Sequence, residues 1–335
     1  MKAIQSFGLK DVRLVDVPDP RPKAGQVIVA VKGSGICGSD KWLWWNEKPT
    51  TAIAGHEVAG EVVEVGPGVQ TLKVGDRVAV NNVVGCGTCP ACQAGAFVLC
   101  PNWDGSADVN GGFGEYVAAP ERNCLLLDDS IRYQTAALIF DNMGTPYHAV
   151  QRAGVTAGDC VVVSGCGPIG LGAVIFARLQ GAAVIALDPL AYRREKALAL
   201  GAEAAFAPGA DTPARVRELT GGLGARVFIE CSGRGEAYPL GMACLRHGGV
   251  LTAVGEHAHF EFHPSEMLIR KALDLRGSWY STMPDGARIQ SLILEGRINP
   301  DVLVTHRGPL AEFPQLFEKV CEFGEDVIKA VIVNP

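Results

Sequence analysis

Four cysteines lie within fifteen positions of this 335-residue sequence, at Cys86, Cys89, Cys92 and Cys100. Thiolates with the spacing C-x2-C-x2-C-x7-C can converge on one tetrahedral zinc ion. Four protein ligands leave no coordination position open, so such an ion would hold a loop and do no chemistry. A disulfide staple, a C-x-x-C redox pair and a zinc-ribbon nucleic-acid module are the alternatives. The spacing favours a structural zinc in the segment 85–100.

A second set of metal-binding residue types is divided between two short stretches. "GICGSD" carries Cys37, Ser39 and Asp40, and "AGHEVAGEV" carries His56 and Glu57. Each stretch is flanked by glycine and lies at the end of an expected strand. A thiolate and an imidazole could be two of the three protein ligands of a catalytic zinc, which keeps its fourth position open.

A glycine-rich turn is the third feature that could do chemistry. It follows a buried apolar strand and precedes a helical pattern, which is the context that makes a G-x-G-x-x-G sequence specific for dinucleotides. We expect the first glycine to allow a tight turn, the second to admit a pyrophosphate, and the third to let helix and strand pack closely. The expected cofactor-binding residues of this turn are Gly165, Gly167, Pro168, Ile169 and Gly170.

An acid follows at the end of the next strand. Asp188 stands eighteen residues after Gly170, where a carboxylate receives the ribose hydroxyls of NAD and repels the additional phosphate of NADP. Arg193 could lie beside that ribose, although Arg193 and Arg194 could also accept a 2′-phosphate. The free energy needed to bury the Asp188 carboxylate against a phosphate exceeds the favourable interaction that an exposed arginine would give. We therefore expect NAD as cofactor, with NADP disfavoured.

The elements that must position these residues divide the chain into two parts. Up to about residue 120, short alternating strands are separated by glycine turns, as in a partly open β-barrel. From about residue 150, apolar strands alternate with helical patterns, as in a doubly wound parallel sheet. A helix near 285–296 and a final strand "KAVIVNP" resemble the pattern of the first 120 residues more than the alternating strands and helices that follow residue 150. We expect a discontinuous first domain, 1–148 and 284–335, and a second domain, 149–283.

Composition narrows the range of partners. The chain is 48% hydrophobic and 20% charged, and 30 basic against 36 acidic side chains give a net charge of −6. Without a basic run, neither nucleic acid nor an anionic membrane is an expected partner. No 18-residue apolar run and no signal-peptide layout are present, so a cytoplasmic location is expected. The expected partners are small molecules and copies of the same chain.

Taken in order, these motifs resemble the zinc-dependent medium-chain alcohol and polyol dehydrogenases over essentially the whole chain. The matching segments are "GICGSD", "GHEVAGEVVEVGPGV", "VGDRV", the four-cysteine lobe, "GGFGEYV", "GTPYHAV" and "GCGPIGL". The resemblance implies an α/β protein with a GroES-like β-barrel catalytic domain and a Rossmann NAD-binding domain. It also implies two zinc ions per chain, an active site in the cleft between the domains, and a homodimer or homotetramer.

The resemblance assigns roles to individual residues. Cys37, His56 and Asp141 are implied as ligands of the catalytic zinc, with Glu57 as a neighbouring or alternating ligand. Ser39 is implied as the group that takes the proton of the substrate hydroxyl, and Asp40 as the carboxylate that holds the His56 ring. Asp141 could instead cap a loop, and Ser39 could cap a turn.

Two departures concern the stretch "KWLWWNEKPTT" after Cys37. Many relatives have a histidine five residues after the zinc cysteine, which completes a proton relay, whereas this chain has Trp42. The relay must therefore leave by another route. Trp42, Trp44 and Trp45 could line the substrate cleft or pack against the barrel.

The sequence predicts an NAD-dependent zinc dehydrogenase that interconverts a secondary alcohol and its ketone. The expected substrate is a polyol, sugar or cyclitol, and a simple secondary alcohol is the second candidate. A zinc-free quinone or enone reductase and a catalytically silent binding relative are rival predictions for the function. The alternation in "EHAHFEFHP" predicts a solvated or oligomer-edge strand with His257, His259 and His263 on one face, in preference to a third metal site.

Overall fold

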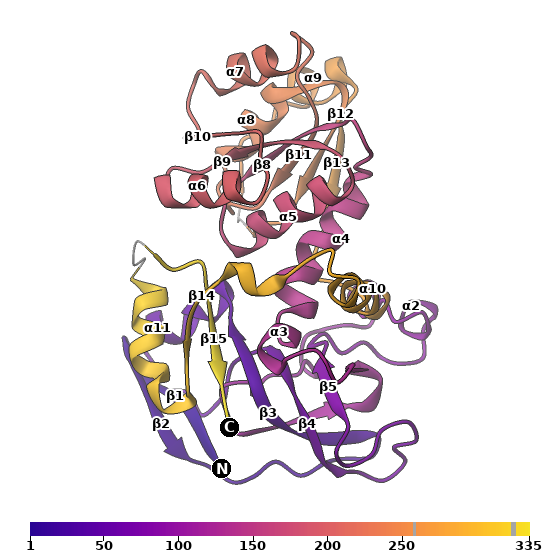
Figure 1. Cartoon of the computed structure of the whole chain (residues 1–335), viewed down its shortest axis with the longest axis vertical. Helices are drawn as coiled ribbons and strands as arrows, with labels where there is room; N and C mark the ends of the chain where they lie inside the picture. The colour runs from indigo at the N-terminus through magenta and orange to yellow at the C-terminus, as the bar shows by residue number, and fades with distance from the viewer. Residues whose placement is uncertain (257–258, 323–325) are drawn as a thin grey trace. The chain divides into compact units, whose positions relative to one another are not determined.

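A computed structural model describes residues 1–256, 259–322 and 326–335, and the chain forms two compact units (Figure 1). Unit 1 comprises Met1–Gly144 and Ser281–Pro335, and unit 2 comprises Thr145–Tyr280. The chain therefore leaves unit 1 and returns to it. These divisions fall a few residues before the domain boundaries expected from the sequence.

Unit 1 is built mainly from antiparallel strands. A hairpin of β1 and β2 stands beside a seven-stranded sheet of order β14-β15-β3-β4-β5-β7, in which β6 also pairs with β3. Inward-facing valines of β3, β4 and β5 form its core, as the alternation in the sequence requires. The strand bounds are β1 Lys2–Gly8, β2 Asp11–Asp16, β3 Gln26–Ile36, β4 Glu57–Val65, β5 Arg77–Val80, β6 Tyr116–Pro120, β7 Cys124–Leu126, β14 Val304–Gly308 and β15 Lys329–Val333.

Strand register in unit 1 brings distant segments to one place. In the antiparallel pair of β3 and β4, Gly35 lies opposite Glu57. On the other side of β3, Ala330 of β15 lies opposite Ile36. The end of β3, the start of β4 and the start of β15 therefore meet at one end of the sheet.

The helices of unit 1 are mostly single turns. A π-helical turn, Ile139–Met143, follows α3 and leads into α4, Gly144–Ala153. The longer helices α10 and α11 come from the C-terminal part of the chain (Figure 1). The remaining bounds are η1 Gly38–Lys41, α1 Trp42–Trp45, α2 Pro90–Gln93, η2 Phe97–Leu99, η3 Glu121–Asn123, α3 Tyr133–Ala136, α10 Met283–Leu294, η6 Pro300–Leu303, η7 Leu310–Glu312 and α11 Phe313–Cys321.

Unit 2 is a six-stranded parallel sheet of order β10-β9-β8-β11-β12-β13. Figure 1 shows α5 and α6 on one face and α7, α8 and α9 on the other, so the fold is the doubly wound sheet expected from the sequence. The bounds are β8 Cys160–Ser164, α5 Pro168–Leu179, β9 Ala183–Leu187, α6 Ala191–Ala199, β10 Ala204–Phe206, α7 Thr212–Leu219, β11 Ala225–Glu230, α8 Ala237–Cys244, β12 Leu245–Ala253, α9 Pro264–Met267, η5 Ile269–Lys271 and β13 Asp274–Gly277.

The strand predicted for the alternating histidines is wrong. His259 lies in irregular backbone and His263 immediately precedes α9, while His257 lies outside the described residues. Phe260, between the histidines, instead stacks on Tyr238 with ring centroids 4.4 Å apart. Within the described residues, the alternation therefore reflects a partly buried aromatic residue in a loop.

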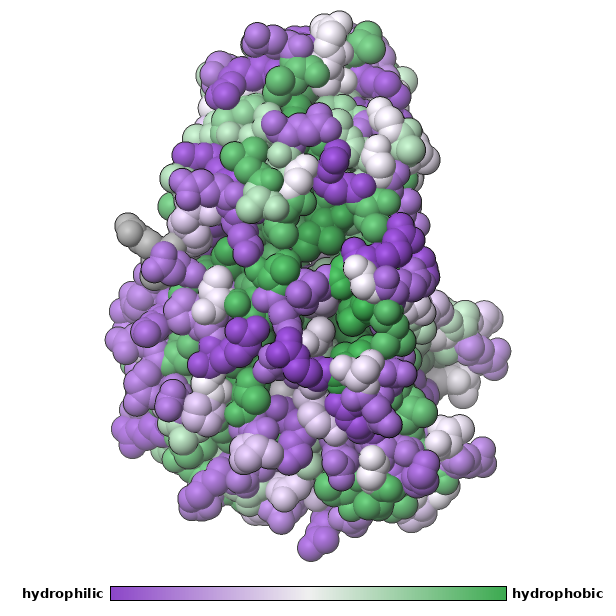
Figure 2. Space-filling view, in the orientation of Figure 1, coloured by the Kyte–Doolittle hydropathy of each residue, from purple (hydrophilic) through white to green (hydrophobic). Residues whose placement is uncertain are grey.

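Hydrophilic side chains are spread over the face drawn in Figure 2, with hydrophobic patches between them. Among the described residues, no helix combines the length and apolar character that crossing a membrane requires.

Glu121 in η3 stabilises a turn of unit 1. Its Oε1 accepts hydrogen bonds from the backbone N–H groups of Gln70, Thr71 and Leu72 and from the Thr71 hydroxyl. Burial would raise the pKa of Glu121, but these hydrogen bonds outweigh it and hold the pKa below its usual value.

We expect Glu121→Gln to destabilise unit 1 at pH 7 by about 1 to 2 kcal/mol, because charge-assisted hydrogen bonds are lost. A depressed pKa stabilises the fold above the unfolded value of about 4.3, and this contribution disappears as the pH falls through the folded value. Calorimetry should therefore show that Glu121→Gln is less stable than the parent at pH 7, and that this difference in stability shrinks below about pH 4. Glu64→Gln, at an exposed position, is the control; a deficit independent of pH would contradict the assignment.

Candidate metal centres and dinucleotide site

Unit 1 brings together four residues that could hold a metal ion. One ligand atom from each of Cys37, His56, Glu57 and Asp141 lies within 4.8 Å of the others. Cys37 follows β3, His56 immediately precedes β4, Glu57 opens β4, and Asp141 lies in the π-helical turn. These are the residues that the resemblance to zinc-dependent dehydrogenases implied for the catalytic zinc.

The His56 ring is held between two carboxylates. Its Nε2 lies 3.0 Å from Asp141 Oδ2, and its Nδ1 lies 3.3 Å from Asp40 Oδ1. The other oxygen of Asp40 accepts the Cys37 N–H at 2.8 Å. Asp40, which is 2% exposed, therefore fixes the ring and the Cys37 backbone together. This is the arrangement that orients a metal-binding imidazole.

Glu57, which is 2% exposed, is the more deeply buried of the two acids in this group. Its Oε1 pairs with Lys329 of β15, whose Nζ also donates to the Ile36 carbonyl at 2.9 Å. Its Oε2 is buried without a hydrogen-bond partner. A Cβ at Gly35 would overlap that oxygen, so glycine is needed there to accommodate the carboxylate.

The electrostatics of the group favour an added positive charge. Burial and the neighbouring Asp141 raise the pKa of the Cys37 thiol, and burial raises the pKa of Glu57 to about 7. Burial alone would lower the pKa of His56, but Asp40 and Asp141 raise it well above its usual value. Each of the three raised pKa values favours the protonated form of its group, so the site has a shortage of positive charge. A thiolate, an imidazole and a carboxylate suit zinc, and Glu57 Oε2 offers a further oxygen, so the residues fit this ion.

The second cluster is the cysteine lobe. The sulfurs of Cys86, Cys89, Cys92 and Cys100 all lie within 4.8 Å of one another. None of these cysteines is in a disulfide. The Sγ atoms of Cys86 and Cys92 are 4.0 Å apart, and those of Cys89 and Cys100 are 3.9 Å apart. This spacing excludes bonded sulfur pairs and matches the edges of a tetrahedron with metal–sulfur distances of about 2.3 Å.

The backbone around the lobe is shaped for thiolates. The Cys86 N–H donates to Cys100 Sγ and the Cys92 N–H donates to Cys89 Sγ. A Cβ at Gly85 would clash with the Cys92 sulfur, and Arg122 donates to the Gly85 carbonyl. The lobe residues therefore also fit a zinc ion.

The glycine turn of unit 2 joins β8 to α5. Gly165 has φ +88°, which favours glycine. A Cβ at Gly167 would meet open space, whereas one at Gly170 would overlap the Gly165 carbonyl. Pro168 occupies the first helical turn, and no side chain caps the helix N-terminus. The N–H groups that open α5, including that of Ile169, can therefore bind a phosphate.

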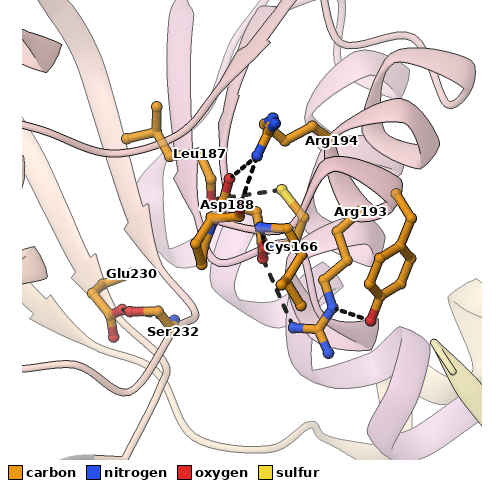
Figure 3. Close-up of polar contacts among 10 residues, drawn as sticks. Cys166, Leu187, Asp188, Arg193, Arg194, Glu230 and Ser232 are labelled. Atoms are coloured by element: carbon orange, nitrogen blue, oxygen red, sulfur yellow. Dashed lines mark hydrogen bonds and ion pairs between the residues drawn. The ribbon is translucent and has the colours of Figure 1, made fainter. Parts of the chain in front are cut away.

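Asp188 lies beside this turn at the end of β9 (Figure 3). Its Oδ2 accepts the Cys166 N–H and its Oδ1 accepts the Leu190 N–H, both at 2.8 Å. Arg193 Nη1 lies 3.8 Å from Asp188 Oδ2, and Arg193 Nε donates a hydrogen bond to the Tyr192 hydroxyl. Arg194 instead donates to the carbonyls of Asp188 and Pro189. The Asp188 carboxylate thus supports the glycine turn.

The remaining predicted residues have different environments. Ser39 in η1 is exposed. Trp44 is buried, packs edge-on against Phe317 and donates to Glu322, so it belongs to the core of unit 1. Trp42 and Trp45 are each 46% exposed. Of the three tryptophans, Trp44 is thus a packing residue.

Lys329, which was not predicted from the sequence, is 2% exposed and pairs with Glu57. Burial would lower the pKa of Lys329, but Glu57, Cys37 and Asp141 raise it. The sequence did contain one indication of this buried pair, because a lysine begins the otherwise apolar final strand.

We expect Lys329→Met to destabilise unit 1 by about 3 kcal/mol, because it leaves the Glu57 carboxylate buried without its cation. In Lys329→Met/Glu57→Gln the loss should be smaller, since no charge remains unpaired. Denaturant unfolding of the two single variants and the double variant measures this coupling. Additive losses would show that the two side chains do not depend on each other.

Two family models match the chain. The model described as "Alcohol dehydrogenase GroES-like domain" matches residues 23–129, and the model described as "Zinc-binding dehydrogenase" matches residues 168–293. Together they cover more than half of the sequence.

The chain is also similar to individual proteins over nearly its full length. It is 34% identical over 324 residues to L-galactonate-5-dehydrogenase of Escherichia coli K12, covering 93% of each chain. It is 34% identical over 340 residues to L-threonine 3-dehydrogenase of Thermococcus kodakarensis, covering 95% of this chain and 93% of the relative. Among solved structures, an Escherichia coli CFT073 alcohol dehydrogenase complexed with NADH matches with a TM-score of 0.90, 26% identity, and coverage of 100% and 99%.

Proposed function

Because this chain belongs to the zinc-dependent medium-chain dehydrogenase family, we propose that it transfers hydride between a secondary hydroxyl of a polyhydroxylated substrate and NAD. The reaction converts the alcohol to a ketone and NAD to NADH. The observation that carries the proposal is the convergence of Cys37, His56 and Asp141 in unit 1, beside Glu57. The four-cysteine lobe supports a second, structural zinc, giving two ions per chain.

The side chains of unit 1 have separable tasks in this reaction. Zinc, when bound, supplies a Lewis acid that makes the substrate hydroxyl more acidic. Cys37 and Asp141 provide two negative charges to match the dication, and His56 binds through the ring nitrogen opposite the one held by Asp40. Ser39 is an exposed residue, so we assign its hydroxyl to take the proton of the substrate hydroxyl and to pass its own proton to water.

The side chains of unit 2 bind and orient the dinucleotide. NAD, when bound, supplies the carbon that accepts the hydride. The first N–H groups of α5 bind its pyrophosphate, and Gly167 leaves room for the approach. Asp188 accepts the adenosine ribose hydroxyls and repels a 2′-phosphate.

The names of the relatives support the substrate class. L-galactonate-5-dehydrogenase and L-threonine 3-dehydrogenase are both named for a hydroxyl on an inner carbon of a chain. Such a hydroxyl is secondary, and its oxidation gives a ketone. A polyol, a sugar or a sugar acid fits the first name, whereas the second favours an amino acid with a hydroxyl group as the alternative substrate.

The test is NADH formation by the zinc-loaded protein across a panel of sorbitol, further polyols, cyclitols, L-galactonate, L-threonine and 2-propanol. We expect turnover of at least one polyhydroxylated secondary alcohol, and loss of turnover with a chelator. NAD-linked reduction of an enone with no alcohol oxidation would contradict the proposal and favour a quinone or enone reductase.

We expect Asp188→Ala to raise the NADP-to-NAD ratio of kcat/KM by about tenfold or more, because the repulsion of the 2′-phosphate is removed. The variant should also bind NAD less tightly, since the Cys166 N–H loses its acceptor. Steady-state kinetics with both cofactors measures the ratio. Asp159→Asn, at the opposite end of the same sheet, is the control; an unchanged ratio in Asp188→Ala would contradict the assignment.

A homodimer or homotetramer in the cytoplasm completes the proposal. Light scattering coupled to size-exclusion chromatography tests the assembly, and a monomer at micromolar concentration would contradict it.

A further inference from the structure

Glu230 is a buried acid with no task in the reaction described above. It is the last residue of β11 and has no exposed surface. β11 and β9 are the two neighbours of β8, the strand that leads into the glycine turn. The turn is therefore flanked by two buried acids, Asp188 at the end of β9 and Glu230 at the end of β11 (Figure 3).

The Glu230 carboxylate receives donors from the segment that follows it. Its Oε1 accepts the Ser232 N–H at 2.7 Å and the Ser232 hydroxyl, and its Oε2 accepts the Gly233 N–H at 3.3 Å. Burial raises the pKa of Glu230, while these hydrogen bonds oppose the shift. An ionised carboxylate has two acceptor oxygens, whereas an amide would present a donor to one of these N–H groups.

The segment held by Glu230 lies against the glycine turn. A Cβ added to Gly165 would stand 2.7 Å from both N and Cα of Ser232, so the two backbones are in direct contact. The Cys231 N–H also donates to the Ser164 carbonyl at 2.8 Å. On the far side, a Cβ at Gly255 would stand 2.8 Å from Glu230 Oε2. Glu230 thus fixes Ser232 and Gly233 between the ends of β8 and β12.

We propose that Glu230 is a positioning residue for dinucleotide binding: by holding Ser232 and Gly233 it supports the Gly165 turn from the side opposite Asp188. The inference rests on the proposed function, because it takes the glycine turn as the NAD site. Since the turn is already formed, the pyrophosphate binds without the entropy loss of ordering the loop. Loss of the carboxylate weakens dinucleotide binding and leaves the alcohol chemistry of unit 1 intact.

The test is NADH binding to Glu230→Gln, measured by fluorescence titration at a temperature where calorimetry shows the apo protein folded. We expect the dissociation constant to rise about tenfold. The KM for NAD should rise by a similar factor, with kcat at saturating NAD within about twofold of the parent. Glu203→Gln is the matched control, because Glu203 precedes β10 and pairs with the exposed Arg178. It should bind NADH as the parent does.

Ser232→Ala provides an independent variant if Glu230→Gln does not fold. It removes one of the three donors, so we expect a dissociation constant about threefold higher. An unchanged dissociation constant in the folded variants, with normal binding by the parent, overturns this inference alone. A parent protein that does not bind NADH overturns the proposed function as well. A fall in kcat at unchanged KM for NAD would also contradict a positioning role in binding.

Discussion

Asp141→Ala is expected to lose alcohol oxidation by about a thousandfold or more while keeping the fold and NADH binding. Asp141 contributes one of the two negative charges among the three proposed ligands and lies 3.0 Å from the His56 ring. Without Asp141, two of the three proposed ligands remain and one positive charge of the ion is not balanced. The site should therefore bind zinc less tightly and should no longer orient the substrate hydroxyl. Initial rates of NADH formation with the best substrate of the panel measure the effect.

The controls for Asp141→Ala separate the metal site from the fold. Zinc analysis should show one ion fewer per chain than in the parent, because the lobe keeps its own. Asp16→Ala, which changes an exposed carboxylate of unit 1, should retain both zinc and activity. Full activity of Asp141→Ala with its complete zinc content would show that the carboxylate only caps the loop.

Cys100→Ser is expected to release the lobe zinc and to destabilise unit 1. Metal binding to a folded site contributes directly to folding free energy, about 10 kcal/mol or more for structural zinc in small domains. Losing even about 4 kcal/mol of this would lower the unfolding temperature by about 10 °C for a unit of this size. Calorimetry with a colorimetric zinc assay measures both quantities.

Cys124→Ala is the matched control for Cys100→Ser, because Cys124 is a thiol of unit 1 outside both metal clusters. It should keep both zinc ions and lose about 1 kcal/mol of stability. A Cys100→Ser variant with parental zinc content and unfolding temperature would contradict a structural zinc in the lobe.

The candidate sites differ in how far the sequence could predict them. The lobe ligands all lie between Cys86 and Cys100, so short-range spacing carries the information. Cys37 and His56 depend on the register of β3 and β4, which the glycine-flanked strand ends indicate. Asp141 comes from a π-helical turn 85 residues from His56, and no periodicity signals that meeting. Only the resemblance to known dehydrogenases assigned it.

The buried pairs show why the remainder needed a structure. Glu57 and Lys329 are 272 residues apart and meet because β15 pairs with β3. Such long-range pairing leaves no local pattern in the sequence. The alternating histidines are the opposite case, because a local pattern was present but the described residues His259 and His263 lie in no strand. Local patterns therefore predicted most elements, failed at the histidine segment, and could not predict which distant residues meet.

The most direct test of the central claim is an anomalous difference map from crystals of the zinc-loaded protein, collected on both sides of the zinc absorption edge. We predict one peak among the four lobe sulfurs and a second peak about 2.0 to 2.3 Å from Cys37 Sγ, a His56 ring nitrogen and an Asp141 oxygen. A single peak in the lobe, with no zinc at Cys37, His56 and Asp141, would contradict the account.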